Sequence, residues 1–189
     1  MAEFLARLFG RWQHAADALE EEPIRGELYS VERLEQTAAQ LAAEQQIFAA
    51  GSRGKSLLPR LEENGRRLIL AYRALADALS GGRSISPAAE WLVDNFHIVE
   101  EQLREIREDL PQGYYRELPK LAAGELSGYP RIYAIALTLI AHTDSRLDTE
   151  TLRRFIRAYQ QVTPLSIGEL WAIAITLRLA LVENLRRLA

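Results

Sequence analysis

The chain has 189 residues, of which 48% are hydrophobic and 26% are charged, and its net charge is −3 at pH 7. These values fit one ordinary globular domain and exclude a disordered chain, while the acidic balance disfavours a nucleic-acid module that neutralises phosphates. Because the sequence has no cysteine, it also excludes disulfides, thiolate nucleophiles and cysteine metal sites.

Apolar residues recur with helical spacing in every long segment and nowhere alternate as they would in a strand. We therefore predict an all-α fold without a sheet, a compact bundle of about seven or eight helices that forms one domain over residues 1–189. The connections between helices carry Gly, Pro or Ser and are mostly short, which favours antiparallel neighbours. The expected helices cover residues 2–19, 31–50, 57–79, 87–110, 114–121, 130–142 and 148–161, followed by a last helix after residue 166.

The segment of residues 2–19 predicts a short amphipathic helix, in which Phe4, Leu8 and Trp12 are flanked by Arg7 and Arg11. Such a helix can lie on an anionic membrane surface, or it can pack onto this domain or onto a partner, which we favour. Charged residues interrupt the segment too often for a secretory signal. The most apolar run, residues 170–182, is shorter than the ~20 residues of a membrane span and predicts a buried helix.

Residues 49–56 nearly spell a phosphate-binding loop, but Ala49 replaces its first glycine and a helix, not a strand, is expected before it. We interpret this segment as a connection between helices.

The helix expected at residues 87–110 has a clear start, because Ser86 can cap its free N–H groups and Pro87 suits its first position. Its apolar residues follow one face and predict the central row of the core. They are Leu92, Phe96, Val99, Leu103, Ile106 and Leu110. The last helix begins with a capping box formed by Ser166 and Glu169.

Metal and acid–base motifs are incomplete. His97 with Asp94 or Glu100 resembles part of a metal site, but the second histidine that such motifs require is missing. Asp148 is better explained as a helix cap, with Glu150 in the first turn after it. We predict no catalytic residue and no metal ligand in this chain.

Several segments carry aromatic and polar residues that helix formation does not require. They are EWLVDNFHIVEEQ at residues 90–102, GYYRELP at 113–119, YPRIY at 129–133, AHTDSRL at 141–147 and TPLSIGELWAI at 163–173. These segments resemble a region near the start of the bacterial cyclic β-1,2-glucan synthases, very large membrane enzymes that polymerise glucose and close the product into rings. The resemblance is dense over residues 57–189 and thin over residues 1–56. It implies that this chain is a fragment of a much larger parent protein.

The resemblance implies that the parent uses UDP-glucose with a divalent cation at the cytoplasmic face of the bacterial inner membrane. The family's catalytic motifs are absent here, since the sequence has neither an Asp-x-Asp pair on a strand nor Gln-x-x-Arg-Trp. We therefore expect a non-catalytic scaffold or docking module without a cofactor, whose partners are other domains of the parent. The alternative is a carbohydrate-binding module that contacts the growing glucan.

One set of residues can serve interhelical packing, a domain interface or glucan contact, because aromatic rings with polar neighbours suit all three. Within it, Asn95, His97, Tyr115 and Arg116, together with Glu169 and Asn184 outside it, are predicted to tie helices to one another. We favour packing over an interface, and an interface over glucan. The set is Trp91, Asn95, His97, Tyr114, Tyr115, Arg116, Arg131, Tyr133 and Trp171.

Overall fold

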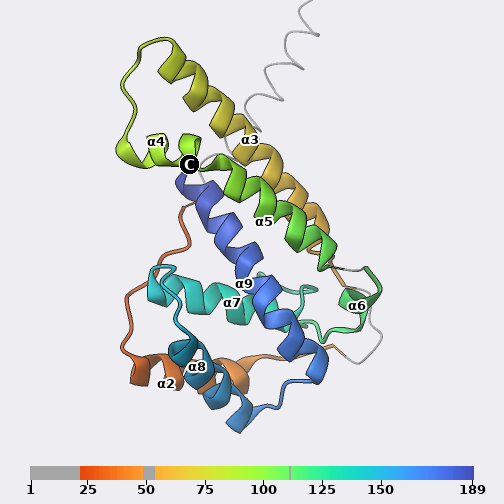
Figure 1. Ribbon diagram of the computed structural model, residues 1–189. Coiled ribbons are helices and arrows are strands. Elements are labelled where there is room, and N and C mark those ends of the chain that lie inside the picture. Colours follow the sequence, from red (N-terminus) through yellow and green to blue (C-terminus); the bar gives the residue numbers. More distant parts are fainter. Residues whose placement is uncertain (1–21, 49–53, 111) are drawn as a thin grey trace, which may run out of the picture.

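The computed structural model describes residues 22–48, 54–110 and 112–189, and within these residues it contains helices and no strand (Figure 1). The predicted all-α fold is therefore confirmed for the described part of the chain, whereas the helix predicted at residues 2–19 lies outside it. The helices are α2 (Val31–Glu44), α3 (Leu58–Ser80), α4 (Pro87–Asp94), α5 (Phe96–Glu108), α6 (Gln112–Glu117), α7 (Arg131–Thr143), α8 (Thr149–Val162) and α9 (Ile167–Leu188).

Polar side chains start the helices as the sequence predicts. The Ser86 hydroxyl accepts a hydrogen bond from the backbone N–H of Ala89 at 3.2 Å. The Asp148 carboxylate accepts one from the N–H of Thr151 at 2.8 Å. Ser166 and Glu169 form the complete capping box, in which each side chain accepts from the backbone N–H of the other. These caps fix where α4, α8 and α9 begin.

Three predicted helices have clearly different bounds in the structure. The helix expected at residues 114–121 covers Gln112–Glu117 instead. The helix expected at residues 31–50 ends at Glu44, and Ile47 instead forms an isolated antiparallel bridge with Leu121. The helix expected at residues 87–110 divides at Asn95 into α4 and α5. The Asn95 side-chain amide donates to the Trp91 carbonyl at 2.8 Å, so it competes with the backbone for a helical acceptor.

The helix α9 connects two groups of helices. In Figure 1, α3, α4 and α5 lie above its centre, whereas α2 and α8 lie below it as a pair and α7 crosses beside it. The helices α3, α5 and α7 all pack against α9, while α2 packs mainly against α8. The helix α7 packs against both α9 and α2, so α7 and α9 together link the two groups.

The predicted central row of the core is confirmed, because all six of its residues, from Leu92 to Leu110, are buried. Phe96 stacks on Tyr72 of α3 with 4.3 Å between ring centroids. A Cβ added at Gly65 of α3 would lie 3.3 Å from the Leu103 side chain, so the missing side chain lets α5 approach α3 closely.

Replacing Phe96 by Ala should lower the free energy of unfolding by about 3–5 kcal/mol, because the ring is 5% exposed and its removal leaves a cavity. Urea unfolding followed by circular dichroism measures the change. The matched control is Ile98→Ala on the same helix, whose side chain is 42% exposed and whose loss should cost about 1 kcal/mol or less. Equal losses for the two variants would contradict the core assignment.

Candidate functional site: buried carboxylates and an exposed stripe on α9

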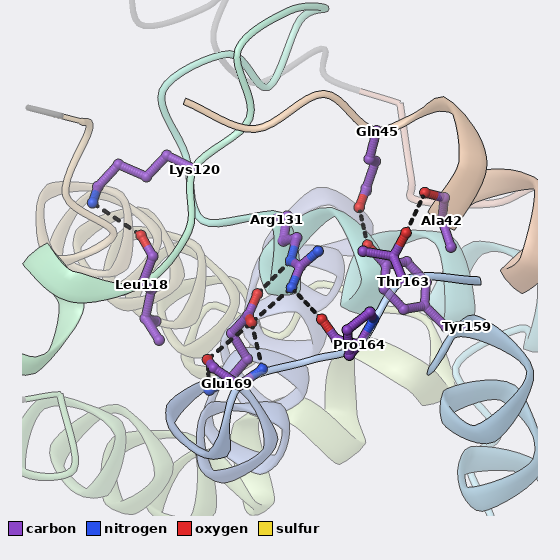
Figure 2. Close-up of polar contacts among 10 residues, drawn as sticks. Ala42, Gln45, Leu118, Lys120, Arg131, Tyr159, Thr163, Pro164 and Glu169 are labelled. Carbon is purple, nitrogen blue, oxygen red and sulfur yellow. Dashed lines mark hydrogen bonds and ion pairs between the residues drawn. The ribbon is translucent and has the colours of Figure 1, made fainter. Parts of the chain in front are cut away.

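The first buried carboxylate of α9 is Glu169, which pairs with Arg131 at the start of α7 (Figure 2). Their side chains are 0% and 5% exposed, and the guanidinium donates to both carboxylate oxygens, at 2.5 and 2.8 Å. Arg131 also donates to the Pro164 carbonyl at 2.9 Å, while its guanidinium lies over the Tyr159 ring. Burial alone would lower the pKa of Arg131, but its hydrogen bonds to Glu169 raise that pKa. The ion pair stays charged and joins α7 to α9.

The second buried carboxylate is Glu183, which is also fully buried. Arg60 of α3 donates to its two oxygens at 2.7 and 2.5 Å, the Tyr133 hydroxyl donates at 2.5 Å and Arg187 donates at 2.6 Å. Burial acts to raise the pKa of Glu183, but these hydrogen bonds, led by that of Arg60, outweigh burial and lower the pKa to about 2. This cluster joins α3, α7 and α9.

A third buried polar side chain on α9, Asn184, fixes the segment before α2. Its carbonyl oxygen accepts from the backbone N–H of Ile24 at 2.7 Å, and its amide donates to the Ser145 hydroxyl at 3.0 Å. Next to it, the Arg187 guanidinium donates to the Glu22 carbonyl at 3.0 Å. The beginning of the described chain therefore lies against the last two turns of α9.

The buried carboxylates and their partners stabilise the fold, and their geometry does not suit catalysis. The oxygens of both buried carboxylates are bound by arginine, hydroxyl or backbone N–H donors, so neither is available as a general base. Lys120 is likewise buried, and burial lowers its pKa. Its ammonium donates to the Arg116 carbonyl and to the Leu118 carbonyl, the second of which Figure 2 shows. Among the described residues, no three carboxylate or histidine side chains gather as metal ligands.

The predicted ties between helices are only partly correct. Glu169 and Asn184 join helices as expected, whereas the Asn95 side chain bonds within its own stretch of chain. The predictions for His97 and Arg116 are wrong, because both side chains are exposed and neither contacts another helix through a hydrogen bond or ion pair in the described structure. Each residue directly follows a core residue and so points outward.

The remaining candidate residues separate into a buried and an exposed group. Tyr115, Arg131 and Tyr133 are 7%, 4% and 0% exposed, so they lie inside the domain and not on its surface. The Tyr115 hydroxyl is buried without a hydrogen-bond partner in the described chain, so it ties no helices together. Tyr114 is half-buried, and its hydroxyl donates to the Gly168 carbonyl of α9.

Both candidate tryptophans belong to the exposed group, with Trp91 at 57% and Trp171 at 76%. Trp171 is part of an apolar row that runs along the whole of α9, with steps of four and three residues that place its members on one face. We call this row the α9 stripe; it consists of Ile167, Trp171, Ala174, Arg178, Leu181, Leu185 and Leu188.

Exposure changes along the α9 stripe. Ile167 is 77% exposed and Ala174 is also exposed, whereas Leu181 and Leu185 are partly covered by the core. In the middle, Arg178 pairs with Glu105 of α5 at 3.3 Å. The first half of the stripe thus presents apolar side chains that the described chain leaves exposed.

Among the described residues, charged side chains line two of the open surface grooves. The groove between α2 and α8 has a volume of about 680 Å³, and the groove between α3 and α5 has about 540 Å³. Their rims carry arginine and glutamate side chains, and neither groove contains an aromatic ring. The two exposed tryptophans lie outside these grooves.

Fold and site define an all-α domain whose buried charged groups connect its helices. No family model matches the chain. The chain is 40% identical over 168 residues to a cyclic β-(1,2)-glucan synthase, NdvB of Rhizobium meliloti (strain 1021), and the matched region covers 88% of this chain. The resemblance predicted from the sequence is therefore confirmed.

The chain spans only 6% of the length of this relative. Because the match of 168 residues is longer than the stretch from Leu57 to Ala189, it also reaches into residues 1–56, where we expected only a thin resemblance. None of the helices in the described part combines the length and apolarity that crossing a membrane requires.

Replacing Glu169 by Gln should destabilise the domain by about 3–5 kcal/mol, because it leaves the buried Arg131 guanidinium without a countercharge. Differential scanning calorimetry measures the change through the melting temperature. The control is Glu101→Gln, which removes only an exposed 3.8 Å pair with Arg104 and should cost about 1 kcal/mol or less. A Glu169→Gln variant that melts like the control would contradict the structural role of the pair.

The low pKa of Glu183 predicts how stability depends on pH. Folding lowers this pKa from 4.5 to about 2. The stability that the carboxylate contributes is therefore complete above pH 4.5 and is lost as the pH falls toward 2, amounting to roughly 2 kcal/mol by pH 3. Urea unfolding at pH 6 and pH 3 tests this, with a ¹³C titration of the Glu183 carboxyl as a direct check. A titration midpoint near the ordinary value would contradict the prediction.

Proposed function

We propose that this chain is a non-catalytic helical module of a cyclic β-1,2-glucan synthase, in which it supports or docks other domains of the enzyme. The observation that carries this proposal is that arginine side chains bind the carboxylates of Glu169 and Glu183. These contacts join α9 to α7 and to α3. The buried charged groups of the domain therefore stabilise the arrangement of its helices. The match to the Rhizobium meliloti synthase supports a role in that system.

In this proposal the rest of the parent performs the chemistry. It transfers glucose from UDP-glucose with a divalent cation and closes the rings at the cytoplasmic face of the inner membrane. The small share of the relative that this chain covers is compatible with such a division, because most of the synthase lies outside the matched region.

The docking surface that we propose includes Trp91 of α4 and Ile98 of α5, which are 57% and 42% exposed. Large aromatic side chains that protrude from a rigid helix are typical anchors of protein interfaces, because they bury much area with little loss of side-chain entropy.

A second candidate function is contact with the growing glucan, favoured by the exposure of Trp91 and Trp171. An indole face can stack on the apolar face of a sugar ring. Against it, the aromatic rings do not line the two grooves, whereas ligand sites are typically concave.

We expect the chain to release no UDP from UDP-glucose with Mg²⁺ or Mn²⁺ above a buffer control, because its buried carboxylates are held by arginine. The proposal that the chain is non-catalytic would be contradicted by turnover that is lost in Asp144→Asn or Asp148→Asn.

Titration calorimetry with β-1,2-glucan oligosaccharides should give no heat. Binding at millimolar or tighter affinity that is lost in Trp91→Ala or Trp171→Ala would instead establish the glucan-binding function.

Docking is tested by mixing this chain with the remainder of the synthase expressed without it. Trp91→Ala should weaken their association about tenfold or more, as expected for an aromatic anchor. The control is Arg116→Ala, which removes another exposed side chain. No association of the unmodified chain, or equal effects of the two substitutions, would count against docking through α4.

A further inference from the structure

The groove between α3 and α5 lies where these two helices run antiparallel in a fixed register. Gly65 of α3 lies against the Leu103 side chain of α5. Seven residues further along α3, Tyr72 stacks on Phe96, which stands seven residues before Leu103. The apolar lining of the groove consists of Gly65, Leu103 and Ile69, and its charged lining consists of Glu62, Arg66, Glu100, Arg104 and Arg107.

The charged side chains of this groove repeat on the two helices. Residues 62–66 read EENGR and residues 100–104 read EEQLR. Each helix therefore carries a glutamate three positions before its contact residue, Gly65 or Leu103, and an arginine one position after it. Because the helices are antiparallel, the two arginines lie on either side of the contact, while the glutamates lie toward opposite ends of the groove. With Arg107, three arginines stand against two glutamates, so the groove has a positive centre in a chain whose net charge is −3.

The groove between α2 and α8 shows how another helix pair of this domain satisfies such charges by itself. There the Arg154 guanidinium donates to both carboxylate oxygens of Glu35 at 2.8 Å, and it lies 3.7 Å from the Glu32 carboxylate. Ion pairs thus join the two sides of that groove, and its charges need no external partner.

The groove between α3 and α5 lacks such connections. Arg66 lies 2.6 Å from Glu63, and Arg104 lies 3.8 Å from Glu101, so both pairs stay within one helix. Within the described residues, no ion pair or hydrogen bond joins the charged residues of its two sides, and Arg107 forms no ion pair. The side chains of Arg66 and Arg104 are 71% and 65% exposed, so these pairs contribute little to stability and leave N–H donors available to a partner.

The exposure and shape of this groove indicate what it binds. Small-molecule sites enclose most of their ligand, whereas exposed arginines hold a lone anion weakly in water. An anionic membrane surface is flat, and Glu62 and Glu100 would repel it. A protein segment suits the groove, because it excludes water along its length, contacts the apolar lining and offers carboxylates to the arginines of both helices.

We propose that the α3–α5 groove binds an acidic amphipathic helix from another part of the parent synthase. This inference rests on the docking function proposed above and adds a second surface to it, since neither Trp91 nor Ile98 lines the groove. Carboxylates of the partner helix pair with Arg66 and Arg104, while its small apolar side chains pack over Gly65. The chain spans 6% of the matched relative, so most of a protein of that kind lies outside it.

The experiment mixes the complete chain with the remainder of the synthase expressed without it, and titration calorimetry measures the dissociation constant. Arg66→Glu combined with Arg104→Glu should raise this constant about tenfold or more, because like charges then meet across the interface. The matched control combines Arg73→Glu with Arg83→Glu, which changes the net charge equally at exposed positions outside the groove. The control should change the constant about twofold or less.

The replaced side chains are exposed, so both double variants should melt like the unmodified chain in circular dichroism. Arg66→Gln combined with Arg104→Gln repeats the test without introducing new charges and should also weaken the association. Raising the salt concentration should weaken the association of the unmodified chain more than that of this neutral variant, because salt screens the ion pairs that the variant lacks.

A second measurement identifies the partner segment. The chain has no native cysteine, so Ile69→Cys in the groove can carry a single benzophenone label. Irradiation of the mixture should crosslink this label to a peptide of the remainder that is rich in Asp and Glu. The control places the same label at Leu70→Cys, whose native side chain is 64% exposed outside the groove, and should lose most of this crosslink.

The outcomes separate this inference from the docking function on which it rests. Association that the groove variant retains and Trp91→Ala weakens would overturn the groove but leave the docking function intact. If the unmodified chain does not associate with the remainder, both are wrong. Crosslinks from Ile69→Cys only to a second copy of this chain, or binding only to anionic lipid vesicles, would show that the groove has a different occupant.

Discussion

The structure depends on two fully buried carboxylates carried by one helix. A buried charge that lacks a partner is strongly destabilising, so Glu169 and Glu183 permit only arrangements in which arginine reaches them. Arg131 begins α7 and Arg60 lies in the first turn of α3. The position of α9 is therefore fixed at two points along its length, by α7 near its start and by α3 near its end. Since desolvation offsets much of the Coulomb attraction, the pairs specify this arrangement more than they add to its stability.

The sequence predicts the helices well because their signals are local. Hydrophobic spacing and the caps at Ser86, Asp148 and Ser166 depend only on residues within one or two turns. The division at Asn95 was not predicted, since it arises from a side chain that competes for the Trp91 carbonyl within an otherwise continuous apolar row. Propensity alone does not distinguish such a residue from one that points into solvent.

The long-range pairs of the site could be predicted only in part. Arg131 and Glu169 were both singled out, but they stand 38 positions apart, and their meeting depends on how α7 crosses α9. The Arg60–Glu183 pair was missed, although a charged residue directly after the apolar run of residues 170–182 is a signal for it. His97 was misplaced because a polar residue beside a core residue usually faces water, whatever its chemical versatility.

Arg178 is the one charged member of the α9 stripe, and this gives the stripe a defined register. Its guanidinium is held by Glu105 at 3.3 Å and by Asp109 at 3.7 Å, while its aliphatic stem remains available for apolar contact. A single polar residue in such a row specifies alignment, because a slip by one turn places the charge against an aliphatic side chain. The same arginine therefore joins α9 to α5 and also interrupts the apolar stripe at its middle.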